Sequence, residues 1–293
     1  MERKFCDLHT HSNYSDGSLT PGQIIDLAEK ANLSAVALCD HNTVDGLPDF
    51  IDAAEGRDIH AIGGAEFSVD YMGIELHLLG LFIDKAYYSQ VAALMQDVRT
   101  RKEQSNLELV DALQKVGYQL DYEAIKAQSP KGNVNRNHIA IALAKTGQVP
   151  SKDYAFARLL SKDAGYYKEP QRITVFQMLD FLRDIHATPV LAHPYLEDES
   201  SKRVIPDHLL HTLLPEAIKR GLAGIEVFYS TYDPTITALA METAMQYGLL
   251  PSGGSDFHGD GKPGLALGSG YGNLSVPYEC FLNLQKSNLH IYS

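Results

Sequence analysis

The sequence predicts an α/β barrel interrupted by an inserted helical cap domain. Short apolar runs of strand length alternate with stretches whose apolar residues recur at helical spacing. Polar side chains follow about six separate strands, which favours a barrel, because a doubly wound sheet gathers its site at one switch point. One long segment, in contrast, shows only helical patterns.

The first strand and turn cover residues 5–17, where Asp7, His9 and His11 alternate along the strand and so point to the same side. Two adjacent imidazoles suit a divalent metal. A surface strand that carries histidines by chance explains an isolated His-x-His pattern equally well. Residues 18–21 then supply an N-cap and a proline for the first helix.

Each later strand leads to polar side chains or carries one. Helical stretches over residues 174–187, 206–220 and 233–247 separate several of these strands. About seven strands are expected, and the polar residues on or after them are Asp40 and His41 (strand 35–39), Glu66 (60–65), His77 (74–82), His193 (188–192), Glu226 (224–228), and Asp256 and His258 (249–254).

Residues 86–167 break the alternation. Helical patterns cover residues 91–116, 135–145 and 152–161, with Gly117 and the loop 129–133 between them. We therefore expect residues 1–85 and 168–293 to form the barrel and residues 86–167 to form the helical insertion. Such an insertion caps a site, excluding water and selecting substrates, or serves only to stabilise the fold.

Composition limits the class of protein. Of 293 residues, 44% are hydrophobic, enough for a sizeable core, and no apolar run approaches the length of a membrane span. The start of the chain lacks an apolar signal region, so a cytoplasmic location is expected. The net charge of −12 argues against binding long nucleic-acid duplexes, although a small anion could bind locally.

Six motifs in order resemble those of the polymerase and histidinol phosphatase (PHP) superfamily of metal-dependent phosphoesterases. That resemblance implies a distorted barrel of seven βα units. The motifs are residues 7–12 (DLHTHS) with 15–17 (SDG), 40–43 (DHNT), 64–66 (GAE), 75–80 (ELHLLG), 192–194 (AHP) and 254–258 (GSDFH).

The resemblance also implies a set of metal ligands. They would hold two or three divalent ions of manganese, iron or zinc, with Glu66, His193 and Asp256 also assigned to catalysis by an activated hydroxide. Asp7 and Asp40 are implied to orient ligand imidazoles. Asn42 departs from the Asp that many relatives carry. The implied ligands are His9, His11, Glu66 and Asp256 for one ion, Glu66, His77 and His193 for a second, and Asp16, His41 and His258 for a third.

Within the superfamily, the helical insertion and residues 224–230 and 270–274 resemble a branch of nucleotide phosphatases and short-RNA exonucleases. The expected reaction is hydrolysis of the 3′-phosphate of a nucleoside 3′,5′-bisphosphate. The alternatives are a 5′-3′ exonuclease on short RNA, a histidinol phosphate phosphatase, or a non-catalytic PHP module. The expected partners are thus a small phosphorylated substrate, a nucleotide or a short oligonucleotide, with no membrane.

A second substrate phosphate needs cations that are not occupied by metal binding. Arg136 and His138 are the first candidates and Arg172 the next, although ordinary surface charge explains each of them equally well. Tyr229 could stack on a base or belong to the core.

Overall fold

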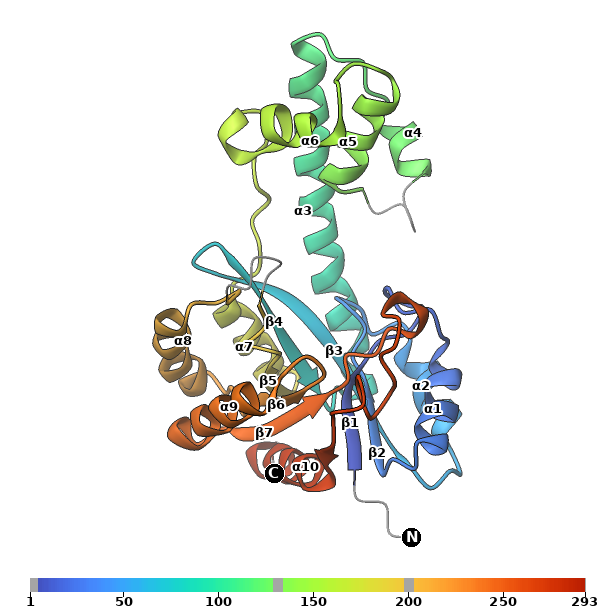
Figure 1. Cartoon of the computed structure of the whole chain (residues 1–293), viewed down its shortest axis with the longest axis vertical. Helices are drawn as coiled ribbons and strands as arrows, with labels where there is room; N and C mark the ends of the chain where they lie inside the picture. The colour runs from blue at the N-terminus through green and yellow to red at the C-terminus, as the bar shows by residue number, and fades with distance from the viewer. Residues whose placement is uncertain (1–4, 129–133, 198–202, 293) are drawn as a thin grey trace. The chain divides into compact units, whose positions relative to one another are not determined.

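The computed structural model describes residues 5–128, 134–197 and 203–292 (Figure 1). The chain forms two compact units: residues 1–93 together with 173–293, and residues 94–172. The predicted loop over residues 129–133 lies outside the described residues.

The first unit is built on one eight-stranded sheet that curls into a nearly closed barrel (Figure 1), which confirms the predicted α/β barrel. The strand order is β7-β6-β5-β4-β3-β2-β1-β8. Two hydrogen bonds join β1 to the segment after β7: Asp256 N–H donates to His9 O (2.8 Å), and His11 N–H donates to Phe257 O (2.9 Å). The strands are β1 (Phe5–Thr10), β2 (Ala35–Leu38), β3 (His60–Tyr71), β4 (Ile74–Leu81), β5 (Thr188–Leu191), β6 (Gly224–Tyr229), β7 (Leu250–Gly254) and β8 (Val276–Pro277).

The distortion of the barrel comes from β4, which runs antiparallel to both β3 and β5. Strands β3 and β4 form a hairpin whose two-residue turn places Met72 at φ 54° and Gly73 at φ 85°, as a tight hairpin turn requires. The expectation that Glu66 follows the end of a strand is therefore wrong, whereas His77 lies within a strand, as expected. Glu66 lies in the middle of β3, and His77 lies in β4 opposite Ser68, because the hairpin extends beyond the parallel strands.

Helices cover the outside of the sheet, and α1 starts at the predicted N-cap and proline. Thr20 caps α1 and Thr174 caps α7, each in a reciprocal pair with a glutamine three residues later. Helix α10 contributes Phe281 and Leu284 to the barrel's apolar core. The helices of this unit are α1 (Pro21–Lys30), α2 (Leu47–Ala54), α7 (Val175–Asp184), α8 (Asp207–Lys219), α9 (Pro234–Tyr247) and α10 (Tyr278–Tyr292).

The second unit is helical throughout its described residues. Its helices are α3 (Tyr88–Lys115), whose first residues belong to the first unit, α4 (Tyr122–Ala127), α5 (Arg136–Lys145) and α6 (Lys152–Ala155), and a π-helical turn follows at residues 156–160. These helices pack around their own apolar core, which includes Leu113, Ile139 and Leu160. In the described part of the chain, no helix has both the length and the apolar character that crossing a membrane would need.

Candidate metal centre

Glu66 is the centre of the polar cluster inside the barrel. Its side chain is 1% exposed. Two imidazoles lie close to one of its oxygens and three lie close to the other. Oε1 lies 2.8 Å from His77 Nδ1 and 3.0 Å from His193 Nε2. Oε2 lies 3.0 Å from His41 Nδ1 and 3.3 Å from both His9 Nε2 and His11 Nε2. A carboxylate shared in this way is suited to bridge two cations.

Asp256 follows β7 with a positive φ of 55°, a strained conformation that aims its carboxylate back into the barrel. Its Oδ1 faces the imidazoles, 3.1 Å from His11 Nε2 and 3.4 Å from His258 Nδ1. Its Oδ2 accepts hydrogen bonds from Tyr229 Oη (2.7 Å) and Lys262 Nζ (2.5 Å). The two oxygens therefore have different tasks, and only Oδ1 is directed at the cluster.

Asp16 reaches the cluster from the turn that follows β1. Its Oδ1 lies 3.2 Å from His258 Nε2, and its Oδ2 lies 3.7 Å from His41 Nε2. The turn needs glycine at position 17, because a Cβ there would lie only 2.4 Å from the carbonyl oxygen of His11. Gly17 thus allows the chain to fold back so that Asp16 meets histidines from two other loops.

The donor atoms of these side chains fit metal ions. They form three overlapping groups, in each of which the donor atoms lie within 4.8 Å of one another: His9, His11, Glu66 and Asp256; His41, Glu66 and His77; and His11, Asp16, His41 and His258. Among the described residues, the buried side-chain nitrogens and oxygens that lack a hydrogen-bond partner belong to this cluster, except for Ser252 Oγ; they are His9 Nε2, both ring nitrogens of His11, Glu66 Oε2 and His77 Nδ1.

Buried polar atoms normally find hydrogen-bond partners, so this group needs an explanation. They belong to groups of donor atoms that lie within 4.8 Å of one another. Neutral imidazoles together with carboxylates are the donors that first-row divalent metals prefer. The cluster is therefore able to bind metal ions.

Glu226 also belongs to the cluster, although it was not among the predicted ligands or orienting residues. It is fully buried on β6, with Oε1 3.0 Å from His9 Nδ1 and with Oε2 accepting the backbone N–H of His193 at 2.8 Å. A carboxylate on Nδ1 fixes the ring so that Nε2 faces the cluster. The sequence signal was one acidic residue inside the apolar strand 224–229.

Asp7 and Asp40 differ from their expected role of orienting imidazoles. Asp7 accepts hydrogen bonds from the backbone and hydroxyl of Ser255 (2.9 and 2.5 Å) and from Gly268 N–H (2.8 Å). Asp40 accepts from the backbone and hydroxyl of Ser12 (2.8 and 2.6 Å) and from Ser15 Oγ (2.6 Å). Both carboxylates fasten the loops that carry cluster residues, because each accepts backbone N–H and hydroxyl donors of those loops.

The structure shows the hydrogen bonds of Tyr229 and Asn42. Tyr229 is buried, as a core residue would be, but its hydroxyl donates to Asp256 and so supports the cluster. Asn42, the departure from the family pattern, pairs with Ser68: its Oδ1 accepts the Ser68 N–H at 3.1 Å. Asn42 thereby ties the loop after β2 to β3.

The imidazoles and carboxylates set one another's protonation. Burial raises the pKa of Glu66, but the neighbouring imidazoles of His9, His193 and His77 outweigh it and hold that pKa well below its usual value. Burial lowers the pKa of His77, yet the contact with Glu66 raises it to about 10, whereas burial lowers the pKa of His11 to about 4. A cation entering the cluster therefore displaces protons from some ring nitrogens.

The three predicted substrate-binding residues lie in the helical unit, where each has local partners. Arg136 Nη1 donates to Leu160 O (2.9 Å), and its guanidinium lies over the Tyr167 ring, 4.2 Å from the centroid. His138 Nδ1 accepts the N–H of Asn135 as part of the α5 cap, and Arg172 pairs with Glu169 (3.0 Å). Their role in substrate binding stays a prediction.

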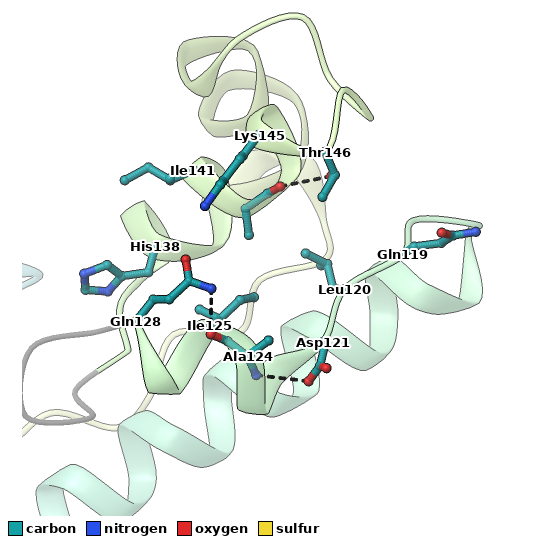
Figure 2. A pocket seen from close by; sticks show the side chains of 11 residues that line it. Gln119, Leu120, Asp121, Ala124, Ile125, Gln128, His138, Ile141, Lys145 and Thr146 are labelled. Carbon is teal, nitrogen blue, oxygen red and sulfur yellow. Dashed lines mark hydrogen bonds between the residues drawn. The ribbon is translucent and has the colours of Figure 1, made fainter.

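His138 also lines a pocket of about 480 Å³ within the helical unit. Figure 2 shows the side chains that line this pocket, among them His138, Gln128 and Lys145, together with Ile125 from α4 and Ile141 from α5. Most of the surface of this pocket is apolar.

Comparisons with known proteins place the chain among phosphate-ester hydrolases. The family model described as the PHP domain matches residues 7–167, more than half of the chain. A 5′-3′ exoribonuclease from Haemophilus influenzae is 29% identical, with 88% of this chain and 91% of that protein aligned. A phosphoribosyl 1,2-cyclic phosphate 1,2-diphosphodiesterase from Eggerthella lenta is 30% identical (86% and 94%). A 3′,5′-nucleoside bisphosphate phosphatase from Chromobacterium violaceum is 28% identical (89% and 90%).

A solved structure has the same fold. It is that of a protein proposed to be a metal-dependent phosphoesterase, from Bifidobacterium adolescentis, and it matches with a TM-score of 0.69 over 96% of both chains, at 24% identity.

Proposed function

The chain belongs to the PHP domain family and is a metal-dependent phosphoesterase, and from this premise we propose that it removes the 3′-phosphate of nucleoside 3′,5′-bisphosphates. The observation that carries the proposal is the buried Glu66 carboxylate, whose oxygens are shared by five imidazoles. We propose that two or three ions of manganese, iron or zinc are held by His9, His11, Asp16, His41, Glu66, His77, His193, Asp256 and His258.

Ions bound by these residues would neutralise the charge of the phosphate and make a water molecule acidic enough to act as the nucleophile near neutral pH. Glu66 would supply carboxylate oxygens to the ions, and Asp256 would present one oxygen to them while Tyr229 and Lys262 hold the other. Glu226 keeps His9 in the tautomer whose Nε2 is free to bind.

Serine nucleophiles are not part of this proposal. The two serines beside cluster residues donate their hydroxyls to carboxylates: Ser12 Oγ to Asp40 (2.6 Å) and Ser255 Oγ to Asp7 (2.5 Å). Each hydroxyl is therefore engaged in fastening a loop. We therefore infer that water, and not one of these two hydroxyls, attacks the phosphate.

The substrate class is supported by relatives. The protein from Chromobacterium violaceum is named for the bisphosphate reaction, and it aligns with 89% of this chain. The relative from Haemophilus influenzae supports a second candidate, a 5′-3′ exonuclease acting on short RNA, because it aligns over a similar length at 29% identity. In both reactions a phosphate ester attached to ribose is hydrolysed. The cytoplasmic location and the capping role of the helical unit remain predictions.

The test combines metal analysis with three substrates. Protein purified without added metal is analysed for its elements and assayed with adenosine 3′,5′-bisphosphate, a short 5′-phosphorylated RNA and histidinol phosphate. We expect the bisphosphate to give the highest kcat/KM. A preference for the RNA would support the second candidate, and a preference for histidinol phosphate would contradict both.

Substitution of a proposed ligand tests the metal assignment. We expect Asp256→Ala and His193→Ala each to lower kcat by about 10³-fold, since losing a ligand removes several kcal/mol of charge stabilisation. Asp52→Ala and His208→Ala, at exposed positions on α2 and α8, are the matched controls. Normal turnover in the ligand variants would refute the assignment.

A further inference from the structure

A small pocket adjoins the metal centre inside the first unit. Its volume is about 200 Å³, and His77 and His193, which both contact Glu66, form part of its wall. Leu76, Leu196, Val204 and Ile205 provide most of the remaining lining. Whatever group is bound at the metal centre would therefore have this pocket directly beside it.

The lining selects by charge. Glu75 is the one carboxylate among the described residues that line the pocket. Its side chain is half exposed, and its Oε1 lies 3.8 Å from His77 Nε2. No lysine or arginine is among the described residues that line it. A second phosphate would be repelled there and would gain no hydrogen-bonding cation, so the pocket is unsuited to the other phosphate of a bisphosphate.

The lining also selects by shape. Pockets for whole drug-sized ligands measure about 300–1,000 Å³, so this one takes only part of a nucleotide. Aliphatic side chains suit the faces of a flat ring, whereas a ribose would place most of its oxygens against aliphatic carbon, with Glu75 as the carboxylate acceptor at the rim. The part of a nucleotide that matches is the base.

We propose that this pocket binds the nucleobase of the substrate whose phosphate is held at the metal centre, an inference that rests on the proposed function. The aliphatic residues contact the faces of the base, and Glu75 at the rim accepts a hydrogen bond from an exocyclic amino group. Adenine and cytosine carry such a donor, and uracil presents a carbonyl oxygen at the corresponding position. The pocket thereby favours adenosine over uridine substrates.

The test compares adenosine 3′,5′-bisphosphate with the abasic bisphosphate in which hydrogen replaces the base. Both kcat/KM and the Kd of the metal-loaded protein, by calorimetry, are measured. Burying a base typically gives about 5- to 150-fold in affinity, and we expect the adenosine compound to be favoured within that range. Because Kd reports binding alone, the ratio of the two Kd values tests the pocket even if neither compound is hydrolysed.

Substitutions in the lining test whether this pocket causes the preference for the adenosine compound. Val204→Trp fills the pocket from a partly exposed position, and we expect it to reduce the adenosine-to-abasic ratio to within about twofold of unity. Leu196→Trp is the second variant, in case the first fails to fold as judged by circular dichroism. Ile51→Trp, at an exposed position on α2, is the control and should keep the wild-type ratio. Glu75→Gln should narrow the difference between adenosine and uridine bisphosphates.

Equal binding of the adenosine and abasic compounds would overturn the inference, as would an unchanged ratio in both tryptophan variants. Equal hydrolysis of the two compounds would leave the proposed function standing while refuting the base pocket. Tighter binding of the adenosine compound with no hydrolysis of either would support the pocket and refute the phosphatase.

Discussion

Replacing Glu226 by glutamine removes one charge without changing the shape of the side chain. In the wild type, one oxygen faces His9 Nδ1 at 3.0 Å and the other accepts the His193 N–H at 2.8 Å, in a fully buried position. An amide offers one acceptor and one donor, so one of these two groups must lose its acceptor.

Either orientation of the amide harms the metal centre. If the amide nitrogen faces His9, the ring proton moves to Nε2, the atom that points at Glu66 and Asp256. If it faces His193, the buried N–H is left unpaired at a cost of about 1–3 kcal/mol. Loss of a carboxylate that orients a metal-bound histidine typically lowers metal affinity by about 10- to 100-fold, and we expect Glu226→Gln to fall in this range.

The assay is a competition titration of zinc or manganese against a fluorescent chelator, with metal-free protein. Glu242→Gln, on the exposed face of α9, is the matched control and should bind like the wild type. Turnover at saturating metal should recover most of the loss in Glu226→Gln if the residue acts by positioning His9. Wild-type metal affinity in this variant would refute the reasoning.

Two further predictions concern charge around the centre. Lys262 Nζ lies 2.5 Å from Asp256 Oδ2, and its side chain is one-third exposed, so we expect Lys262→Met to lower kcat/KM by about tenfold and Lys262→Arg to retain part of the activity. Steady-state kinetics with the exposed Lys219→Met as control checks this, and an unchanged kcat/KM would contradict it. The second concerns pH: because Glu66 raises the pKa of His77 to about 10 against the effect of burial, the metal-free ring is protonated at neutral pH. Apparent metal affinity should therefore rise by about tenfold per pH unit for each proton displaced, up to about pH 10, and calorimetry in buffers of different ionisation enthalpy should detect the released protons; binding independent of pH would count against this protonation state.

Local signals in the sequence were enough for the barrel and for much of the cluster. The capping pairs at Thr20 and Thr174 predict helix starts because their hydrogen bonds span only three residues. His9 and His11 share a side of β1 because strand side chains alternate. Helix α2 and the antiparallel direction of β4 were not predicted, because they depend on how distant segments pack.

For the residues around the proposed ligands, too, the sequence predicted which side chains are present but not all of their partners. The motifs named the side chains that meet at Glu66, but they assigned Asp7 and Asp40 to imidazoles, whereas these carboxylates bind the loops at Ser255 and Ser12. The two hydrogen bonds between Asp7 and Ser255 join residues 248 positions apart in the chain. Such pairings are set by how the barrel closes.

The sequence alone therefore determined the alternation of strands and helices, the helical insertion and the types of side chain at the metal centre, because each depends on neighbours along the chain. Only the tertiary structure decided that Glu66 lies among five imidazoles, that Glu226 orients His9, and that an apolar pocket adjoins His77 and His193. These features arise where strands far apart in sequence come together. Their geometry depends on the closed barrel, which no short stretch of sequence specifies.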